Sequence, residues 1–136
     1  MKVLIVEDDE DQAEDLEKTL RSAFKGIKIT RIELEREFLE RFDEVAEGRY
    51  DLAILDMMLE WSDPAPNLPP PPGTFDEAGL RCHQKLKSDA RTAHVPVLVL
   101  SVLRKNLPDG MDYVIKTHDL SNIIPKVSEI IDRRKQ

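Results

Sequence analysis

Cysteine is nearly absent from this chain of 136 residues, and aromatic side chains make up only 5% of it. The single cysteine, Cys82, excludes an internal disulfide and fits a reducing compartment. No apolar run approaches the roughly 20 residues that a membrane-spanning helix needs, and no signal-peptide pattern precedes the first apolar run. We therefore expect a cytoplasmic protein with no membrane partner.

Positively charged residues are fewer than negatively charged ones: 20 Lys and Arg stand against 27 Asp and Glu, which gives a formal net charge of -7. An acidic protein is repelled by the phosphate backbone of nucleic acids, so we expect no direct DNA binding. Hydrophobic residues are 40% of the chain and charged residues 35%, which is typical of a globular domain. The length suits one core, and we expect a single domain over residues 1–136.

Five short apolar runs alternate with stretches whose apolar residues recur at helical spacing. Short apolar runs predict strands that are buried on both faces, which is typical of parallel sheets. The alternation indicates an α/β fold with a doubly wound parallel sheet. We expect Gly48 to end the second helix and Pro125 to lie in the first turn of the last. The expected strands cover residues 3–6, 27–29, 52–55, 97–100 and 113–115, and the expected helices residues 13–24, 38–46, 76–88 and 119–131.

Polar side chains stand where four of these apolar runs end. Glu7 and Asp8 follow the first run, Asp56 the third, Ser101 the fourth and Lys116 the fifth. The carboxyl ends of parallel strands share one edge of a sheet, where open α/β sheets bind ligands. We therefore expect these groups to converge in one crevice. Adjacent carboxylates repel each other and favour a cation, and Mg²⁺ prefers oxygen ligands.

Each of these side chains also has a simpler structural explanation. Glu7 or Asp8 alone could cap a helix, Ser101 could bond to a turn, and Lys116 could extend into solvent. Asp9 is expected to be the N-cap of the first helix and nothing more. Polar side chains at the ends of four strands that share one edge favour a binding site over these separate structural explanations.

Four segments resemble, in the same order, the receiver domain of bacterial response regulators: VLIVEDDEDQ, YDLAILDMML, VPVLVLS and DYVIK. The resemblance covers nearly the whole chain, from Lys2 to about Arg134. It implies a flavodoxin-like sheet of five parallel strands in the order 2-1-3-4-5, with helices on both faces. It also implies a phosphoacceptor signalling domain of a two-component system or phosphorelay, which is not an enzyme beyond slow loss of its own phosphate.

The resemblance implies a Mg²⁺ site among the acidic residues. Asp8 and Asp56 would be direct ligands, Glu7 would act through a water molecule, and the backbone carbonyl of Met58 would complete the set. Mg²⁺ keeps several waters, so one or two carboxylates suffice to bind it. Phosphoryl transfer depends on charge neutralisation and alignment, which such a site provides.

The resemblance further implies that Asp56 accepts a phosphoryl group from a histidine kinase or phosphotransfer partner. Lys116 would pair with the phosphoryl oxygens, and Ser101 would donate a hydrogen bond to them. Tyr113 matches the aromatic switch position of the family, although simple core packing is an open alternative. The sequence identifies neither the kinase nor the downstream protein target.

The chain departs from the family pattern after both Ser101 and Lys116. Thr117 follows Lys116, where proline is usual, and a cis bond without proline costs about 3 kcal/mol or more, so we expect a trans bond. Val102 follows Ser101, where the family prefers a smaller residue, and we expect its branched side chain to hinder access. The interval from Ser101 to Lys116 is short, so the fourth helix of the family pattern is expected to be shortened or missing.

A proline-rich insertion over residues 60–75 follows Asp56 and lengthens the usual path to Gly79. Its prolines remove backbone donors, so neither a helix nor an interior strand is expected, and Pro69 to Pro72 favour polyproline II. The insertion could be a solvated family variation. Alternatively it folds over the site or docks a partner, with Trp61 as an apolar anchor.

Two other functions are alternatives to phosphoacceptor signalling. Thr117, Val102 and the short interval favour a pseudo-receiver, a protein-binding module that works without phosphorylation. A Mg²⁺-dependent phosphatase on a similar sheet is less well supported, because such enzymes usually carry a second aspartate two residues after the nucleophile. Met58 occupies that place.

Overall fold

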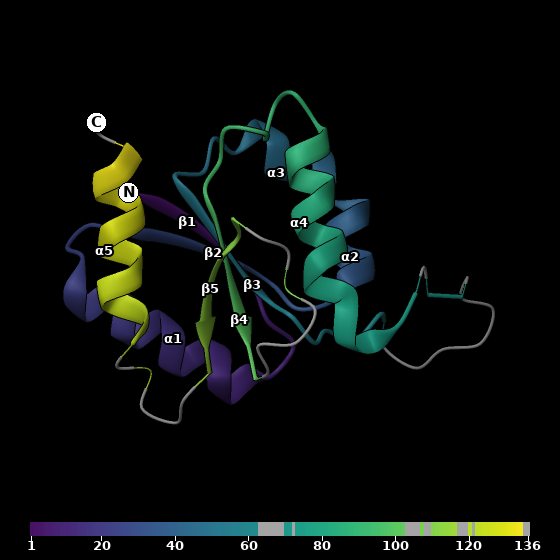
Figure 1. The fold of residues 1–136 in the computed structure, drawn as a ribbon, viewed down its shortest axis with the longest axis horizontal. Helices are drawn as coiled ribbons and strands as arrows, with labels where there is room; N and C mark the ends of the chain where they lie inside the picture. Colours follow the sequence, from purple (N-terminus) through teal and green to yellow (C-terminus); the bar gives the residue numbers. More distant parts are fainter. Residues whose placement is uncertain are drawn as a thin grey trace.

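The computed structural model describes residues 1–62, 70–71, 73–102, 107, 110–116, 120 and 122–134. One sheet of five parallel strands runs through the molecule in the order β2-β1-β3-β4-β5 (Figure 1). The flavodoxin-like order expected from the resemblance is confirmed. The strands are β1 (Lys2–Val6), β2 (Lys28–Ile32), β3 (Leu52–Asp56), β4 (Val97–Ser101) and β5 (Asp112–Ile115).

Helices cover both faces of the sheet. They are α1 (Glu10–Ala23), α2 (Glu35–Glu40), α3 (Phe42–Glu47), α4 (Ala78–Ser88), preceded by a 3₁₀ turn, η1 (Phe75–Glu77), and α5 (Ile123–Arg134). Figure 1 shows α1 and α5 on one face, and α2, α3 and α4 on the other. Among the described residues, no helix is both long and apolar enough to cross a membrane.

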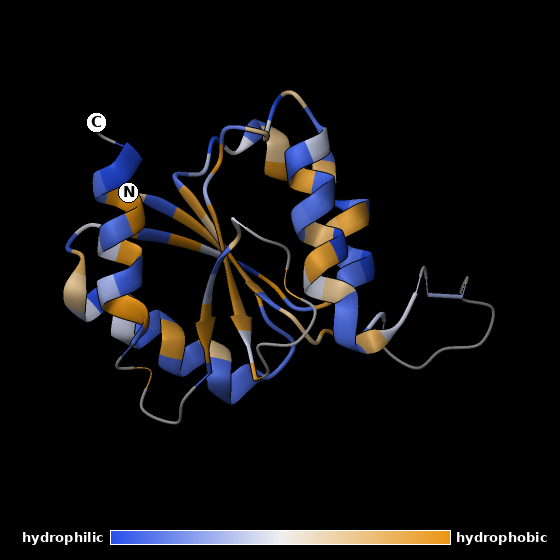
Figure 2. Ribbon diagram, in the orientation of Figure 1, coloured by the Kyte–Doolittle hydropathy of each residue, from blue (hydrophilic) through white to orange (hydrophobic). Residues whose placement is uncertain are grey.

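Alternate residues of the strands pack into two separate hydrophobic cores. In β1, Leu4 and Val6 face α2, α3 and α4, whereas Val3 and Ile5 face α1 and α5. Every residue of β3 and β4 is buried, as expected for the central strands of a parallel sheet. Figure 2 shows hydrophobic residues along these strands, while the helices carry mixed surfaces. The sequence predicted this burial correctly.

The helix starts follow local chemistry. Asp9 is the N-cap of α1, and its side chain accepts a hydrogen bond of 3.0 Å from the backbone N–H of Gln12, as predicted. Pro125 is the third residue of α5, within the first turn, where a missing N–H breaks no intrahelical bond.

The prediction of one continuous helix over residues 38–46 is wrong, because the structure has two short helices there, α2 and α3. They are separated at Arg41, whose ψ of 16° departs from helical geometry. The rings of Phe38 and Phe42 meet edge to face across this break, with centroids 5.7 Å apart. Arginine is a good helix former, so nothing in the sequence marked the interruption.

Gly48 lies at the end of α3 as predicted, but for a different reason. Its φ of -69° needs no glycine, and the left-handed conformation falls on Arg49, with φ 53°. A Cβ on Gly48 would lie 2.5 Å from the Tyr50 ring. Glycine is therefore required here by packing and not by backbone conformation.

Two predicted features fall largely outside the described residues. Between β4 and β5 the structure describes residues 102, 107, 110 and 111, none of which is helical. The prediction that the family's fourth helix is shortened or missing concerns the rest of that interval, residues 103–106 and 108–109, which lie outside the described residues. Residues 63–69 and 72 of the proline-rich insertion are likewise outside the described residues. Its described parts at 60–62, 70–71 and 73–74 contain neither helix nor strand, but its last residue, Phe75, begins the 3₁₀ turn η1.

Gly79 brings α4 against the backbone of the central strand. A Cβ on Gly79 would lie 2.5 Å from the carbonyl oxygen of Asp56 and 2.6 Å from Cα of Met57. We predict that Gly79→Ala lowers the free energy of unfolding by about 2 kcal/mol, because backbone cannot move aside as a flexible side chain can. Urea unfolding measures this. Gln84→Ala, at an exposed position of the same helix, is the control, and equal stability of both variants would contradict the close approach.

Cys82 is fully buried in α4. Burial, with a smaller contribution from the Glu35 carboxylate, raises the pKa of its thiol to about 12. The folded protein therefore keeps the thiol protonated at pH 8, and we predict no reaction with a disulfide reagent until the chain unfolds. Rapid labelling of the native protein at pH 8, at the rate seen in denaturant, would show the thiol to be accessible.

Candidate metal and phosphoacceptor site

Four strand ends place polar side chains along one edge of the sheet. Glu7 and Asp8 come directly after β1, Asp56 is the last residue of β3, Ser101 is the last residue of β4, and Lys116 follows β5. Because β3 lies between β1 and β4, Asp56 occupies the middle of this row.

Glu7, Asp8 and Asp56 form an acidic cluster. One carboxylate oxygen from each lies within 4.8 Å of those of the other two, and both Glu7 and Asp56 are buried. Burial, followed by the hydrogen bond and the charge of Asp56, raises the pKa of Glu7 to about 9. Carboxylates this close repel each other unless a proton or a cation lies between them.

The acidic cluster fits a hard divalent cation. Its donors are carboxylate oxygens, which are the ligands that Mg²⁺ prefers. In addition, Glu7 Oε2 is buried and has no hydrogen-bond partner among the residues that the structure describes. A buried acceptor without a donor is costly, and a metal-bound water is the kind of donor that would satisfy it.

Lys116 supplies the positive charge of the site. Its Nζ lies 2.8 Å from Asp56 Oδ2 and 3.4 Å from Glu7 Oε1, and it also donates to Gln12 Oε1. Burial by itself would lower the pKa of the ammonium, but the hydrogen bonds and charges of Asp56 and Glu7 outweigh it and raise the pKa. The sequence analysis gave Gln12 no role. Its position in the first turn of α1, next to the acidic residues, was the signal that could have placed it in the site.

The backbone around Asp56 is held on both sides. The N–H of Met58 donates to Asp56 Oδ1 at 3.3 Å, and the N–H of Met57 donates to the carbonyl of Leu100 at 2.9 Å. The carbonyl of Met57 accepts from the N–H of Gly79 at 2.8 Å. These contacts fix the end of β3 between β4 and α4, so the Asp56 side chain projects from a rigid position.

Ser101 and Lys116 are neighbours through the backbone. The carbonyl of Ser101 accepts a hydrogen bond of 2.8 Å from the N–H of Lys116, and the Ser101 side chain is buried. Val102, the next residue, has 53% of its surface exposed. Tyr113 is 36% exposed, so the alternative that it merely packs in the core is wrong. Thr117, on which the expected trans bond depends, lies outside the described residues.

Asp8 connects the site to the start of the proline-rich insertion. Its Oδ2 accepts a hydrogen bond of 2.9 Å from the backbone N–H of Glu60. Partial burial raises the pKa of Asp8, while this N–H opposes the rise. The insertion therefore begins in direct contact with the acidic cluster.

Comparisons with known proteins agree with this geometry. No family model matches the chain. It is 30% identical over 134 residues to the uncharacterized transcriptional regulatory protein YkoG of Bacillus subtilis, covering 92% of this chain and 48% of that protein. The chain thus spans about half the length of this curated relative.

Solved structures of receiver domains superpose over nearly the whole chain. A signal receiver domain of a histidine kinase from Clostridium thermocellum has a TM-score of 0.74 at 16% identity, covering 96% of both chains. TrrA of Thermotoga maritima, in complex with Mg²⁺-BeF, has a TM-score of 0.66 at 24% identity, covering 95% of this chain and 97% of that one. This chain has the receiver-domain fold.

A second structure of TrrA, in complex with the histidine kinase ThkA, matches with a TM-score of 0.64 at 22% identity, over 95% of this chain and 97% of that one. The resemblance seen in the sequence is therefore confirmed in three dimensions. In this receiver fold, Glu7, Asp8, Asp56 and Lys116 lie together at the carboxyl edge of the sheet.

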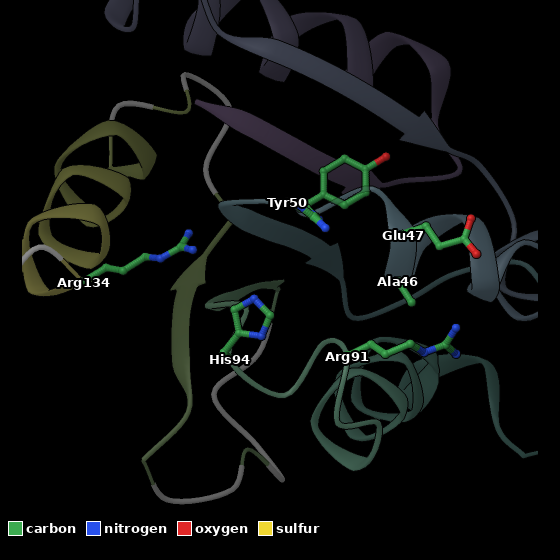
Figure 3. A pocket seen from close by; sticks show the side chains of 7 residues that line it. Ala46, Glu47, Tyr50, Arg91, His94 and Arg134 are labelled. Carbon is green, nitrogen blue, oxygen red and sulfur yellow. The ribbon is translucent and has the colours of Figure 1, made fainter.

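A hollow of about 570 Å³ lies at the opposite edge of the receiver fold, where β3 and β4 begin (Figure 3). Tyr50, Arg91, His94 and Arg134 are among its lining residues. Arg91 is paired with Asp43 and Asp89, and Arg134 with Asp51, while Glu47 adds a carboxylate to a lining that also includes Arg49. We assign no ligand to this hollow.

Lys116 offsets the charge of the acidic cluster, and its removal should be costly. We predict that Lys116→Met lowers the free energy of unfolding by about 3 kcal/mol without divalent cations, because it leaves buried carboxylates unpaired. Thermal or urea unfolding in chelator, compared with added Mg²⁺, measures this. Lys126→Met removes a lysine whose ion pairs with Asp112 and Glu129 are at the surface, and should cost about 1 kcal/mol or less. Equal losses in the two variants would refute the balancing role of Lys116.

Proposed function

We propose that residues 1–136 form one receiver domain, in which Asp56 accepts a phosphoryl group from a histidine kinase or phosphotransfer partner. The observation that carries this proposal is the convergence on Asp56 of two further carboxylates and the Lys116 ammonium, at the carboxyl edge of the sheet. The superposition on TrrA, which was solved with Mg²⁺-BeF and with a histidine kinase, supports both the cofactor and the class of partner.

Mg²⁺ is the proposed cofactor. Asp8 and Asp56 would bind it directly, Glu7 would hold one of its waters, and the Met58 carbonyl would be a further ligand. When bound, the ion supplies positive charge to the transferring phosphoryl group. The buried and unpartnered Glu7 Oε2 supports an assignment in which Glu7 accepts a hydrogen bond from metal-bound water.

The transfer itself requires little covalent chemistry from the protein. An Asp56 carboxylate oxygen forms a bond to phosphorus as the bond between phosphorus and the partner's histidine nitrogen breaks, and that nitrogen regains its electron pair. Lys116, already 2.8 Å from Asp56, neutralises negative charge on the phosphoryl oxygens. The Ser101 hydroxyl would donate to one of these oxygens, and Tyr113 would serve as the switch residue.

The product is a charged signalling state, and we propose no other turnover. Met58 stands where an aspartate-dependent phosphatase would carry its second aspartate, so slow loss of phosphate is the expected limit of any hydrolysis. Output would run through contacts with a downstream protein. The net charge of -7 argues against direct DNA binding.

A pseudo-receiver that binds a protein partner without phosphorylation is the second candidate. It is favoured by the exposed, branched Val102 beside Ser101 and by Thr117 in place of the family's usual proline. The intact acidic cluster and Lys116 argue against it, because a module that never binds Mg²⁺ or phosphate gains nothing from buried carboxylates.

Phosphorylation of Asp56 predicts a specific mass change. Incubation with Mg²⁺ and a small phosphodonor such as acetyl phosphate should add one phosphoryl group to the wild type and none to Asp56→Asn, as read by intact mass. Chelation of Mg²⁺ should abolish the addition. If a folded wild type binds Mg²⁺ but receives no phosphoryl group from either a small donor or a phosphorylated histidine partner, the pseudo-receiver is favoured.

A further inference from the structure

An ion pair outside the site, with a buried carboxylate and a partly exposed guanidinium, joins α2 to α4. The Glu35 carboxylate is only 1% exposed and accepts two hydrogen bonds of 2.7 Å, from Nε and Nη2 of Arg81. This is the bidentate geometry that arginine forms with carboxylates. The hydrogen bond to Glu35 raises the pKa of Arg81 above its ordinary value. Burying the Glu35 carboxylate is expensive, and the proposed phosphoryl transfer uses neither member of the pair.

The ion pair holds the first turn of α2, which is capped from a distant part of the chain. The N-cap residue, Leu34, offers no side-chain hydrogen bond. Instead, the N–H of Glu35 donates to the carbonyl of Glu60 at 3.0 Å, and the N–H of Arg36 donates to the carbonyl of Trp61 at 2.9 Å. The start of the insertion thus satisfies donors that a helix otherwise leaves open.

Glu60 also contacts the acidic cluster with its other backbone group. Its N–H donates to Asp8 Oδ2 at 2.9 Å, while its carbonyl accepts from Glu35. One peptide segment therefore connects a proposed Mg²⁺ ligand to the start of α2. The path from Arg81 through Glu35 and Glu60 to Asp8 consists of hydrogen bonds of 3.0 Å or less.

The far end of the insertion meets the same ion pair. A Cβ on Gly73 would lie 2.7 Å from Nη1 of Arg81, so the backbone at Gly73 passes close to the guanidinium. Near its two ends the insertion therefore approaches α2 and α4, at Trp61 through the N–H of Arg36 and at Gly73 through Arg81.

We propose that Glu35 and Arg81 are positioning residues for the metal site. They hold α2 and the segment at Glu60 in place, and that segment orients the Asp8 carboxylate toward the other ligands. This inference rests on the proposed Mg²⁺ binding. An oriented carboxylate binds a cation more tightly because less conformational freedom is lost on binding, and groups that orient metal ligands typically affect affinity 10–100-fold.

The double variant Glu35→Gln/Arg81→Met tests the proposal without altering the net charge. We expect its Mg²⁺ affinity to fall about five- to tenfold, since the contact is one step removed from the ligand. The readout is calorimetry or the fluorescence of Trp61, the single tryptophan. The control is Arg36→Gln/Glu40→Gln, which removes an exposed ion pair of 2.7 Å from the same helix and also keeps the net charge.

A folded double variant that binds Mg²⁺ within twofold of the wild type would overturn the proposal. So would an equal loss in the control, because that would reflect general weakening of α2. Arg81→Lys provides a milder test that retains the charge but loses the bidentate fork. If the double variant fails to fold, an affinity of Arg81→Lys unchanged from the wild type overturns the proposal, and a loss of about threefold or more supports it.

Hydrogen exchange of the Glu60 amide separates this proposal from the proposed function. Without Mg²⁺, we expect this amide to exchange at least tenfold faster in the double variant than in the control, because the segment at Glu60 is no longer held against its acceptor Asp8. Unchanged exchange would overturn the positioning role even if Mg²⁺ binds. A wild type that binds no Mg²⁺ would instead refute the proposed cofactor, and the Glu60 amide would still decide whether the ion pair orients this segment.

Discussion

The balance of charge at the carboxyl edge of the sheet is the constraint on which the rest of the site depends. Three carboxylates lie within reach of one another at strand ends that are otherwise apolar, and one ammonium lies among them. Such an arrangement is unfavourable in itself, because burial disfavours charge and like charges repel. It persists because three strands of a rigid sheet, β1, β3 and β5, deliver these groups to the same edge, whatever their mutual interactions.

Much of this could be anticipated from local patterns. The apolar runs marked the strands because a strand covered on both faces must be apolar throughout. The residue after each run lies at the carboxyl edge because parallel strands all end at that edge. The acidic cluster followed from topology once the sheet was parallel. The strand order itself came from resemblance and not from the residues, since periodicity does not say which strands are neighbours.

The features that were missed depend on contacts between distant parts of the chain. Glu35 and Arg81 are 46 positions apart, and each looks like an ordinary surface charge on an amphipathic helix. The break at Arg41 lies in a stretch of good helix formers, so only the packing of α2 and α3 reveals it. Gln12 was overlooked because its amide meets Lys116 from the far end of the sequence.

The two anchored ends of the proline-rich insertion have a consequence for its length. Trp61 is held by its hydrogen bond from the N–H of Arg36 in α2, and Gly73 lies close to Arg81, which is paired with Glu35 of α2. The entropy of closing a chain between fixed points grows only with the logarithm of its length, so doubling the number of residues costs only about 0.6 kcal/mol. Sequences of very different length and composition could therefore be exchanged between these anchors at little cost to the fold, which makes this position suited to diversification.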